Sequence, residues 1–220
     1  NFYVGTSSQE EEVSIEQCCT FRGSLVKLSA KTGKILWQTF MVPDNFGNRG
    51  EYAGAAIWGS SPPIDVTRNL VYIATGNLYS APQNITDCQE RQNNQTQVAP
   101  THSDECVEPD NHSDSFLALD LDTGIIKWFH QLGGYDVWFF AFNGTTKDIV
   151  AAVQKSGFVW ALDRDDGNII WSTEAGPGGL TGGGTWGAAT DEKKVYTNIA
   201  NSDGKNFTLK PSTRNTTGGG

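Results

Sequence analysis

The chain has 220 residues, enough for one large domain or two small ones. Its net charge of −9 and the lack of a basic stripe argue against a nucleic-acid-binding surface, and no apolar run approaches the roughly 18 residues of a membrane span. The 25 glycines and seven tryptophans, beside a single methionine, favour tight turns and aromatic packing over a helical bundle.

Two patterns point to the secretory pathway. Asn-x-Ser/Thr triplets, the acceptor pattern for N-linked glycans, lie in polar, turn-rich stretches at Asn84, Asn94, Asn111, Asn143, Asn206 and Asn215. The cysteines lie in similar stretches, at Cys18, Cys19, Cys88 and Cys106. An oxidising compartment explains both patterns, so we expect an extracellular or vacuolar protein. The stretch "NFYVGTSSQE" is no signal peptide, so we expect any leader to be removed or absent from this sequence.

An internal repeat organises the chain. Its three copies are "GSLVKLSAKTGKILW" (23–37), "SFLALDLDTGIIKW" (115–128) and "GFVWALDRDDGNIIW" (157–171). Each has alternating apolar residues, a small-polar turn that ends in Gly, two aliphatic residues and a Trp. This pattern predicts a β-hairpin, because alternation indicates a half-buried strand and Gly supplies the positive φ of the turn.

A second strand–turn–strand unit, "AAIWGSSPPIDVTRNLVYIATGN" (55–77), precedes the second hairpin, and 148–157 and 184–204 are its counterparts. Four strands that close on a Trp describe a blade of an all-β propeller. The spacing from Trp128 to Trp171 fits a blade of roughly 40–50 residues. The spacing from Trp37 to Trp128 is about twice as long, and a polar insertion at 78–114 accounts for the excess.

The predicted blades are the end of one (1–40), two complete ones (53–131 and 135–175) and the start of a fourth (184–220). An arc of about three to four blades leaves strand edges unpaired. We therefore expect this chain to be part of a larger propeller. The remaining blades would come from a second fragment of a nicked protein or from residues absent from this sequence.

The hairpin at 118–128 has the pattern Ala-x-Asp-x-x-Thr-Gly-x-x-x-Trp, and residues 58–77 read "WGSSPPIDVTRNLVYIATGN". Both resemble the repeat and signature of the pyrroloquinoline-quinone (PQQ) dehydrogenases, eight-bladed propellers that oxidise alcohols or sugars. The nearest likeness is to the polyvinyl-alcohol dehydrogenase-like branch, including its plant members. The resemblance implies a PQQ cofactor and extends over nearly the whole chain.

The resemblance also implies site residues. Trp58 matches the tryptophan that stacks on the quinone, although a Trp that packs at an inner strand gives the same pattern. Lys155 matches a basic residue that reaches the quinone oxygens, with a solvated turn lysine as the alternative. Trp186 is expected to line the same funnel.

Calcium is the metal that the resemblance implies. Asn77 matches an amide ligand of that ion, and its alternative is a turn residue at a strand end. In related alcohol dehydrogenases a ligating Glu lies shortly before an Arg-Gly pair, whereas Cys18 lies near that position before Arg22 here. Glu16 or the acidic run 10–12 is the candidate substitute.

The disulfide pattern is partly open. Cys88 with Cys106 is the preferred bridge, because it closes a loop of 18 residues within the insertion and contributes about 3 kcal/mol by chain-entropy estimates. Bridges from Cys18 or Cys19 into the insertion remain open. The adjacent cysteines resemble a vicinal disulfide of some family members, but that disulfide belongs to an earlier blade, so the assignment is not transferred.

The run "YDVWFFAF" (135–142) contains the candidate catalytic base. Related enzymes read His-Asp-x-Trp-Asp, and their second Asp is the base. Phe139 occupies that position here and cannot accept a proton, which leaves Asp136 as the candidate base. Asp136 as a hydrogen-bonded anchor of the blade is the favoured interpretation.

Two functions fit. The first is a PQQ-dependent dehydrogenase that acts on a secondary or polymeric alcohol; no Cys-x-x-Cys-His haem motif is present, so electrons would pass to an external acceptor. The second is a secreted glycoprotein propeller without redox chemistry, used in binding, defence or storage. His102, His112 and His130 lack zinc-ligand spacing, and surface roles are expected for those in the insertion.

Overall fold

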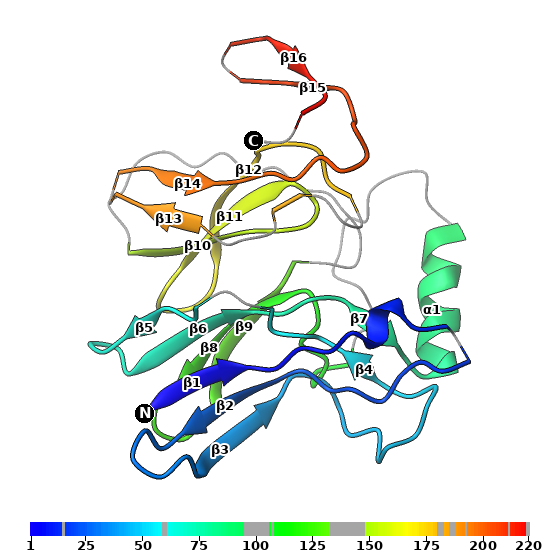
Figure 1. The fold of residues 1–220 in the computed structure, drawn as a ribbon, viewed down its shortest axis with the longest axis vertical. Helices are drawn as coiled ribbons and strands as arrows, with labels where there is room; N and C mark the ends of the chain where they lie inside the picture. The colour runs from blue at the N-terminus through cyan, green and yellow to red at the C-terminus, as the bar shows by residue number, and fades with distance from the viewer. Residues whose placement is uncertain are drawn as a thin grey trace. The chain divides into compact units, whose positions relative to one another are not determined.

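The computed structural model of the chain (Figure 1) describes residues 1–14, 16–58, 61–94, 106, 108–132, 148–179, 183–184, 188–191, 193–210 and 212–218. Contacts divide the chain into two compact units, Asn1–Val137 and Trp138–Gly220. Antiparallel strands dominate both units, and no helix among the described residues is long and apolar enough to cross a membrane.

The described residues of the first unit form three sheets, all with antiparallel neighbours. One has the order β1-β2-β3, a four-stranded one has the order β5-β6-β8-β9, and β4 pairs with β7. The bounds are β1 (Phe2–Gly5), β2 (Ser24–Leu28), β3 (Ile35–Phe40), β4 (Ala53–Gly54), β5 (Ile64–Asp65), β6 (Leu70–Ala74), β7 (Leu78–Ser80), β8 (Ser115–Asp120) and β9 (Ile126–Gln131).

The second unit also consists of antiparallel strands. It contains a sheet of order β10-β11-β12 and two strand pairs, β13-β14 and β15-β16. The bounds are β10 (Ile149–Val153), β11 (Phe158–Asp163), β12 (Ile169–Glu174), β13 (Ala188–Thr190), β14 (Val195–Thr197), β15 (Phe207–Thr208) and β16 (Asn215–Thr216).

The three hairpins that the repeat predicts are confirmed as β2–β3, β8–β9 and β11–β12. Each has a register shift at the equivalent place near the turn, and the turn glycines Gly33, Gly124 and Gly167 all have φ between 70° and 74°. In the second hairpin the Asp120 carboxylate accepts hydrogen bonds from the backbone N–H groups of Asp122 and Thr123 at 3.0 Å. Repeated sequence therefore gives repeated turn geometry.

The closing Trp of the first hairpin packs on the turn of the second. The glycine Gly124 lies so close to the Trp37 ring that a Cβ built on it would be 2.7 Å from two ring carbons. The Leu121 carbonyl oxygen accepts one hydrogen bond from each strand of the first sheet: from Tyr3 Oη at 3.1 Å, Lys27 Nζ at 2.7 Å and Trp37 Nε1 at 3.3 Å. These contacts fix β1–β2–β3 against the β8–β9 turn.

The core of the first unit lies between these two sheets, which Figure 1 shows beside each other. Leu25 of β2 and Leu117 and Leu119 of β8 are completely buried within it. Burial of each such side chain stabilises the fold by about 1.5–3 kcal/mol.

The insertion between β6 and β8 contains a helix that the sequence analysis did not predict, α1 (Gln83–Asn94). The helix is largely polar, and its buried residue Ile85 belongs to the core of the first unit. A disulfide joins Cys88 of the helix to Cys106, with 5.7 Å between their Cα atoms. Ile85 therefore anchors the helix to the core, and the disulfide closes a loop within the insertion itself.

Candidate functional site

Backbone hydrogen bonds bring Trp58 and Asn77 onto neighbouring segments of the first unit. The Ala55 N–H donates to the Asn77 carbonyl oxygen at 2.9 Å, and the Gly76 N–H donates to the Ala56 carbonyl oxygen at 2.8 Å. Trp58 and Asn77, the first and last residues of the signature, therefore lie on segments that are close in space.

The indole of Trp58 is 41% exposed, and Gly76 lies beside it. A Cβ built at Gly76 would be 3.2 Å from Trp58 Nε1, so a larger residue there would displace the ring. An exposed, flat and apolar ring held in this way fits the orientation of a planar tricyclic cofactor. The exposed Trp58 ring is therefore a candidate stacking platform for PQQ.

The set of oxygen ligands for a calcium ion is less complete. The Asn77 amide nitrogen donates to the Leu78 carbonyl at 3.0 Å, which orients the amide and leaves its oxygen as the candidate ligand atom. Glu16 is fully exposed, and a hydrogen bond from Ser14 lowers the pKa of its carboxyl. Among the described residues, no group of three or more His, Cys, Asp or Glu side chains is arranged to hold a metal ion.

The acidic run 10–12 forms the 3-10 helix η1 (Glu10–Glu12). The Glu10 carboxylate accepts the backbone N–H groups of Thr20 and Phe21, both at 2.8 Å. This carboxylate therefore holds the segment that follows the adjacent cysteines, a role that the sequence analysis did not assign.

The structure pairs Cys18 with Cys19, and thereby resolves the pairing that the sequence left open. Cys19 is 1% exposed, and Cys18 Sγ is 4.0 Å from the carbonyl oxygen of Tyr79, two residues after Asn77. No disulfide joins either of these cysteines to the insertion. The adjacent-cysteine disulfide thus lies next to the segment that carries Asn77.

Lys155 lies in the second unit, in the exposed turn between β10 and β11. The neighbouring Gln154 fixes this turn, because its Oε1 accepts hydrogen bonds from Ser156 Oγ at 2.8 Å and Trp160 Nε1 at 3.1 Å. Asp136, Phe139 and Trp186 lie outside the described residues.

The glycosylation triplets have different surroundings. Asn84, Asn206 and Asn215 are exposed, whereas Asn111 is 1% exposed. Asn143 and the side chain of Asn94 lie outside the described residues.

The repeated antiparallel hairpins, with the closing Trp37 of the first packed on the turn of the second, are typical of a propeller built from PQQ-type repeats. A family model described as "Glucose/ethanol/alcohol dehydrogenase, beta-propeller domain" matches residues 4–178. The chain belongs to this PQQ family.

Relatives and solved structures agree with that assignment. The chain is 31% identical to a polyvinylalcohol dehydrogenase of Pseudomonas sp. over 84% of its length, and 29% identical to one of Sphingopyxis sp. (strain 113P3) over 90%. It spans 30% and 32% of those two proteins. The quinohemoprotein alcohol dehydrogenase ADHIIG of Pseudomonas putida HK5 has a similar fold, with a TM-score of 0.55 and 21% identity over 80% of this chain and 26% of that one.

Proposed function

We propose that this chain is part of a quinoprotein dehydrogenase that oxidises secondary or polymeric alcohols and passes electrons to an external acceptor. The observation that carries the proposal is the 31% identity to a polyvinylalcohol dehydrogenase over 84% of the chain. Bound PQQ would supply the redox chemistry, because the quinone takes up the two electrons that leave the alcohol carbon.

The residues have distinct roles in this proposal. Trp58 would hold the quinone by stacking, and Lys155 would supply a positive charge near the quinone oxygens. Trp186 lines the site, Asn77 and Glu16 are the candidate calcium ligands, and Asp136 is the candidate base. The blade boundaries remain a prediction: 1–40, 53–131, 135–175 and 184–220.

The test is reconstitution with PQQ and calcium, followed by binding and dye-reduction measurements with a secondary alcohol. We expect Trp58→Ala to weaken PQQ binding at least tenfold, because the flat platform is lost. Trp58→Phe should retain part of the binding affinity.

Asp136→Asn should lower turnover with little effect on PQQ binding. An Asp136→Asn variant with full activity would exclude that residue as the base.

The second candidate function is a propeller that has lost its redox chemistry and serves in binding, defence or storage. The feature that favours it is Phe139 at the position where the family has its base. The same reconstitution separates the two candidates, since a protein that takes up no PQQ cannot be the dehydrogenase.

We also propose a secretory location. The disulfides and the three exposed glycosylation triplets support it, because both are typical of proteins that fold in an oxidising compartment.

The remaining partner is the rest of the propeller. On the β1-β2-β3 sheet, side chains of the face opposite Tyr3 and Trp37 are unusually exposed for apolar residues: Phe2 (59%), Val4 (44%), Leu36 (51%) and Phe40 (42%). Such a face is the kind that another blade covers, which supports further blades beyond this chain.

A further inference from the structure

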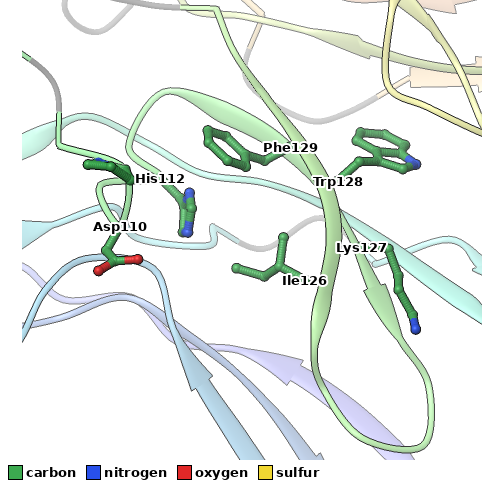
Figure 2. A pocket seen from close by; sticks show the side chains of 7 residues that line it. Asp110, His112, Ile126, Lys127, Trp128 and Phe129 are labelled. Carbon is green, nitrogen blue, oxygen red and sulfur yellow. The ribbon is translucent and has the colours of Figure 1, made fainter.

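A hollow of about 540 Å³ lies in the first unit between strand β9 and the segment 108–112 that precedes β8. Figure 2 shows Ile126 and Phe129 on one side of β9, facing His112 and Asp110 of that segment. We call this hollow the β9 pocket. It uses neither Trp58 nor Asn77, so it is separate from the quinone platform.

The polar wall of the β9 pocket is anchored to both sheets. The His112 N–H donates to the carbonyl oxygen of Met41, which follows β3, at 2.8 Å. The Thr75 hydroxyl, next to β6, donates to the His112 carbonyl oxygen at 2.5 Å. A wall fixed at two points is preformed, which lowers the entropy cost of binding a ligand.

The apolar wall presents an aromatic ring to solvent. Phe129 is paired across the strands with the fully buried Leu117, and it therefore lies on the core-facing side of the sheet. Phe129 is nevertheless 42% exposed, and its ring contacts the His112 ring in an edge-to-face arrangement at a centroid distance of 4.4 Å. A half-exposed ring on an otherwise buried face is available for stacking.

His112 supplies the unusual polar group. The expectation that it is a surface residue is wrong, because its side chain is 8% exposed. Its Nδ1 has no hydrogen-bonding partner among the described residues, and burial lowers the pKa of the imidazole. A neutral imidazole offers one donor and one acceptor, and the exposed carboxylate of Asp110 adds an acceptor.

We propose that the β9 pocket binds an uncharged sugar residue. A pyranose ring has an apolar C–H face, which matches Phe129 and Ile126, and hydroxyl groups on its edge, which match Asp110 and His112. The Asp110 carboxylate disfavours an acidic sugar, and the positive charge of Lys127, which also lines the pocket, is paired with Asp120 at 3.5 Å.

Saturation-transfer NMR tests the proposal on the protein without added PQQ. The probes are the methyl pyranosides of glucose, galactose and mannose, with glucuronate as the charged comparison. We expect transfer to the ring C–H protons of at least one pyranoside and weaker or no transfer to glucuronate. Because PQQ is absent, the result does not depend on the proposed dehydrogenase activity.

Two variants locate the binding. Phe129→Ala and Asp110→Ala should each weaken binding at least tenfold, while Phe2→Ala, which removes an exposed phenylalanine of β1, should leave it unchanged. Circular dichroism verifies that each variant is folded. If Phe129→Ala unfolds, the Asp110→Ala variant still tests the binding site, because Asp110 is exposed. Binding of no pyranoside, stronger binding of glucuronate, or equal binding by the folded pocket variants and Phe2→Ala would overturn the proposal.

Discussion

Asn84 and Asn111 carry the same glycosylation pattern in opposite environments. Asn84 is exposed in the first turn of α1. Asn111 is buried, and its side-chain oxygen accepts the Ser113 N–H at 3.1 Å. A glycan on Asn111 would prevent the segment 108–112 from packing, so molecules that carry one would not reach the folded pool.

We therefore predict a glycan at Asn84 and none at Asn111 in protein secreted from a eukaryotic host. Intact-mass measurement of two matched variants gives the answer. Asn84→Gln should remove the mass of one glycan, and Asn111→Gln should remove none. Glycopeptides that contain a modified Asn111 would contradict the packing argument.

Two individual residues, His112 and His130, make the stability of the fold depend on pH. Burial lowers the pKa of both below 6.5, so between the lowered values and about 6.5 the unfolded chain binds more protons than the folded one. The free energy of unfolding should therefore fall as the pH drops below about 6.5.

Chemical unfolding at several pH values between 5 and 8 measures this slope, and the double variant His112→Gln/His130→Gln should flatten it. Asp120 does not contribute to this slope. Hydrogen bonds from Thr123 are the main cause that lowers the pKa of its carboxyl from 3.8, so the stability that Asp120 contributes is lost only at lower pH. A slope that persists in the double variant would assign the effect to other groups.

At the scale of elements, two turn glycines separate backbone strain from packing. Gly33 and Gly124 have nearly equal φ values, 70° and 73°. A Cβ at Gly33 has no atom within 4 Å, whereas a Cβ at Gly124 meets the Trp37 ring at 2.7 Å.

Gly33→Ala should cost only the left-handed backbone penalty of about 1–2 kcal/mol. Gly124→Ala should cost that penalty and a further 1–3 kcal/mol, because the added methyl group displaces Trp37 from its seat. Urea unfolding of both variants measures the difference. An equal loss would mean that the Trp37 ring moves aside without cost.

The elements were predictable to the extent that they are local. Alternation, turn residues and the closing Trp are properties of short segments, and so the hairpins at 23–37, 115–128 and 157–171 follow from the sequence. Helix α1 was missed because its sequence is largely polar, and a buried anchor such as Ile85 is too weak an apolar pattern to predict a helix.

The site was predictable only in part, for the same reason. Trp58 and Asn77 could be proposed as site residues because both belong to one continuous signature. The capture of backbone N–H groups by Glu10 and the burial of His112 depend on which segments meet in space. No local pattern encodes such contacts.

At the scale of the whole molecule, the uncovered apolar face of β1-β2-β3 and the 30–32% share of the relatives' length argue for further blades. Mass measurement of the native protein under reducing conditions should show a polypeptide much heavier than 23.9 kDa, or a second fragment beside this one. A stable, monomeric species of only 23.9 kDa would contradict this expectation.

The Cys88–Cys106 bridge has a consequence for how such a protein tolerates proteases. A cut at any peptide bond between residues 88 and 106 leaves the two products covalently joined. β6 and β8 are neighbours in one sheet on either side of the cut, so both products also stay paired through backbone hydrogen bonds. The insertion can thus be clipped while the sheet survives, and the damage becomes visible only after a reductant separates the pieces.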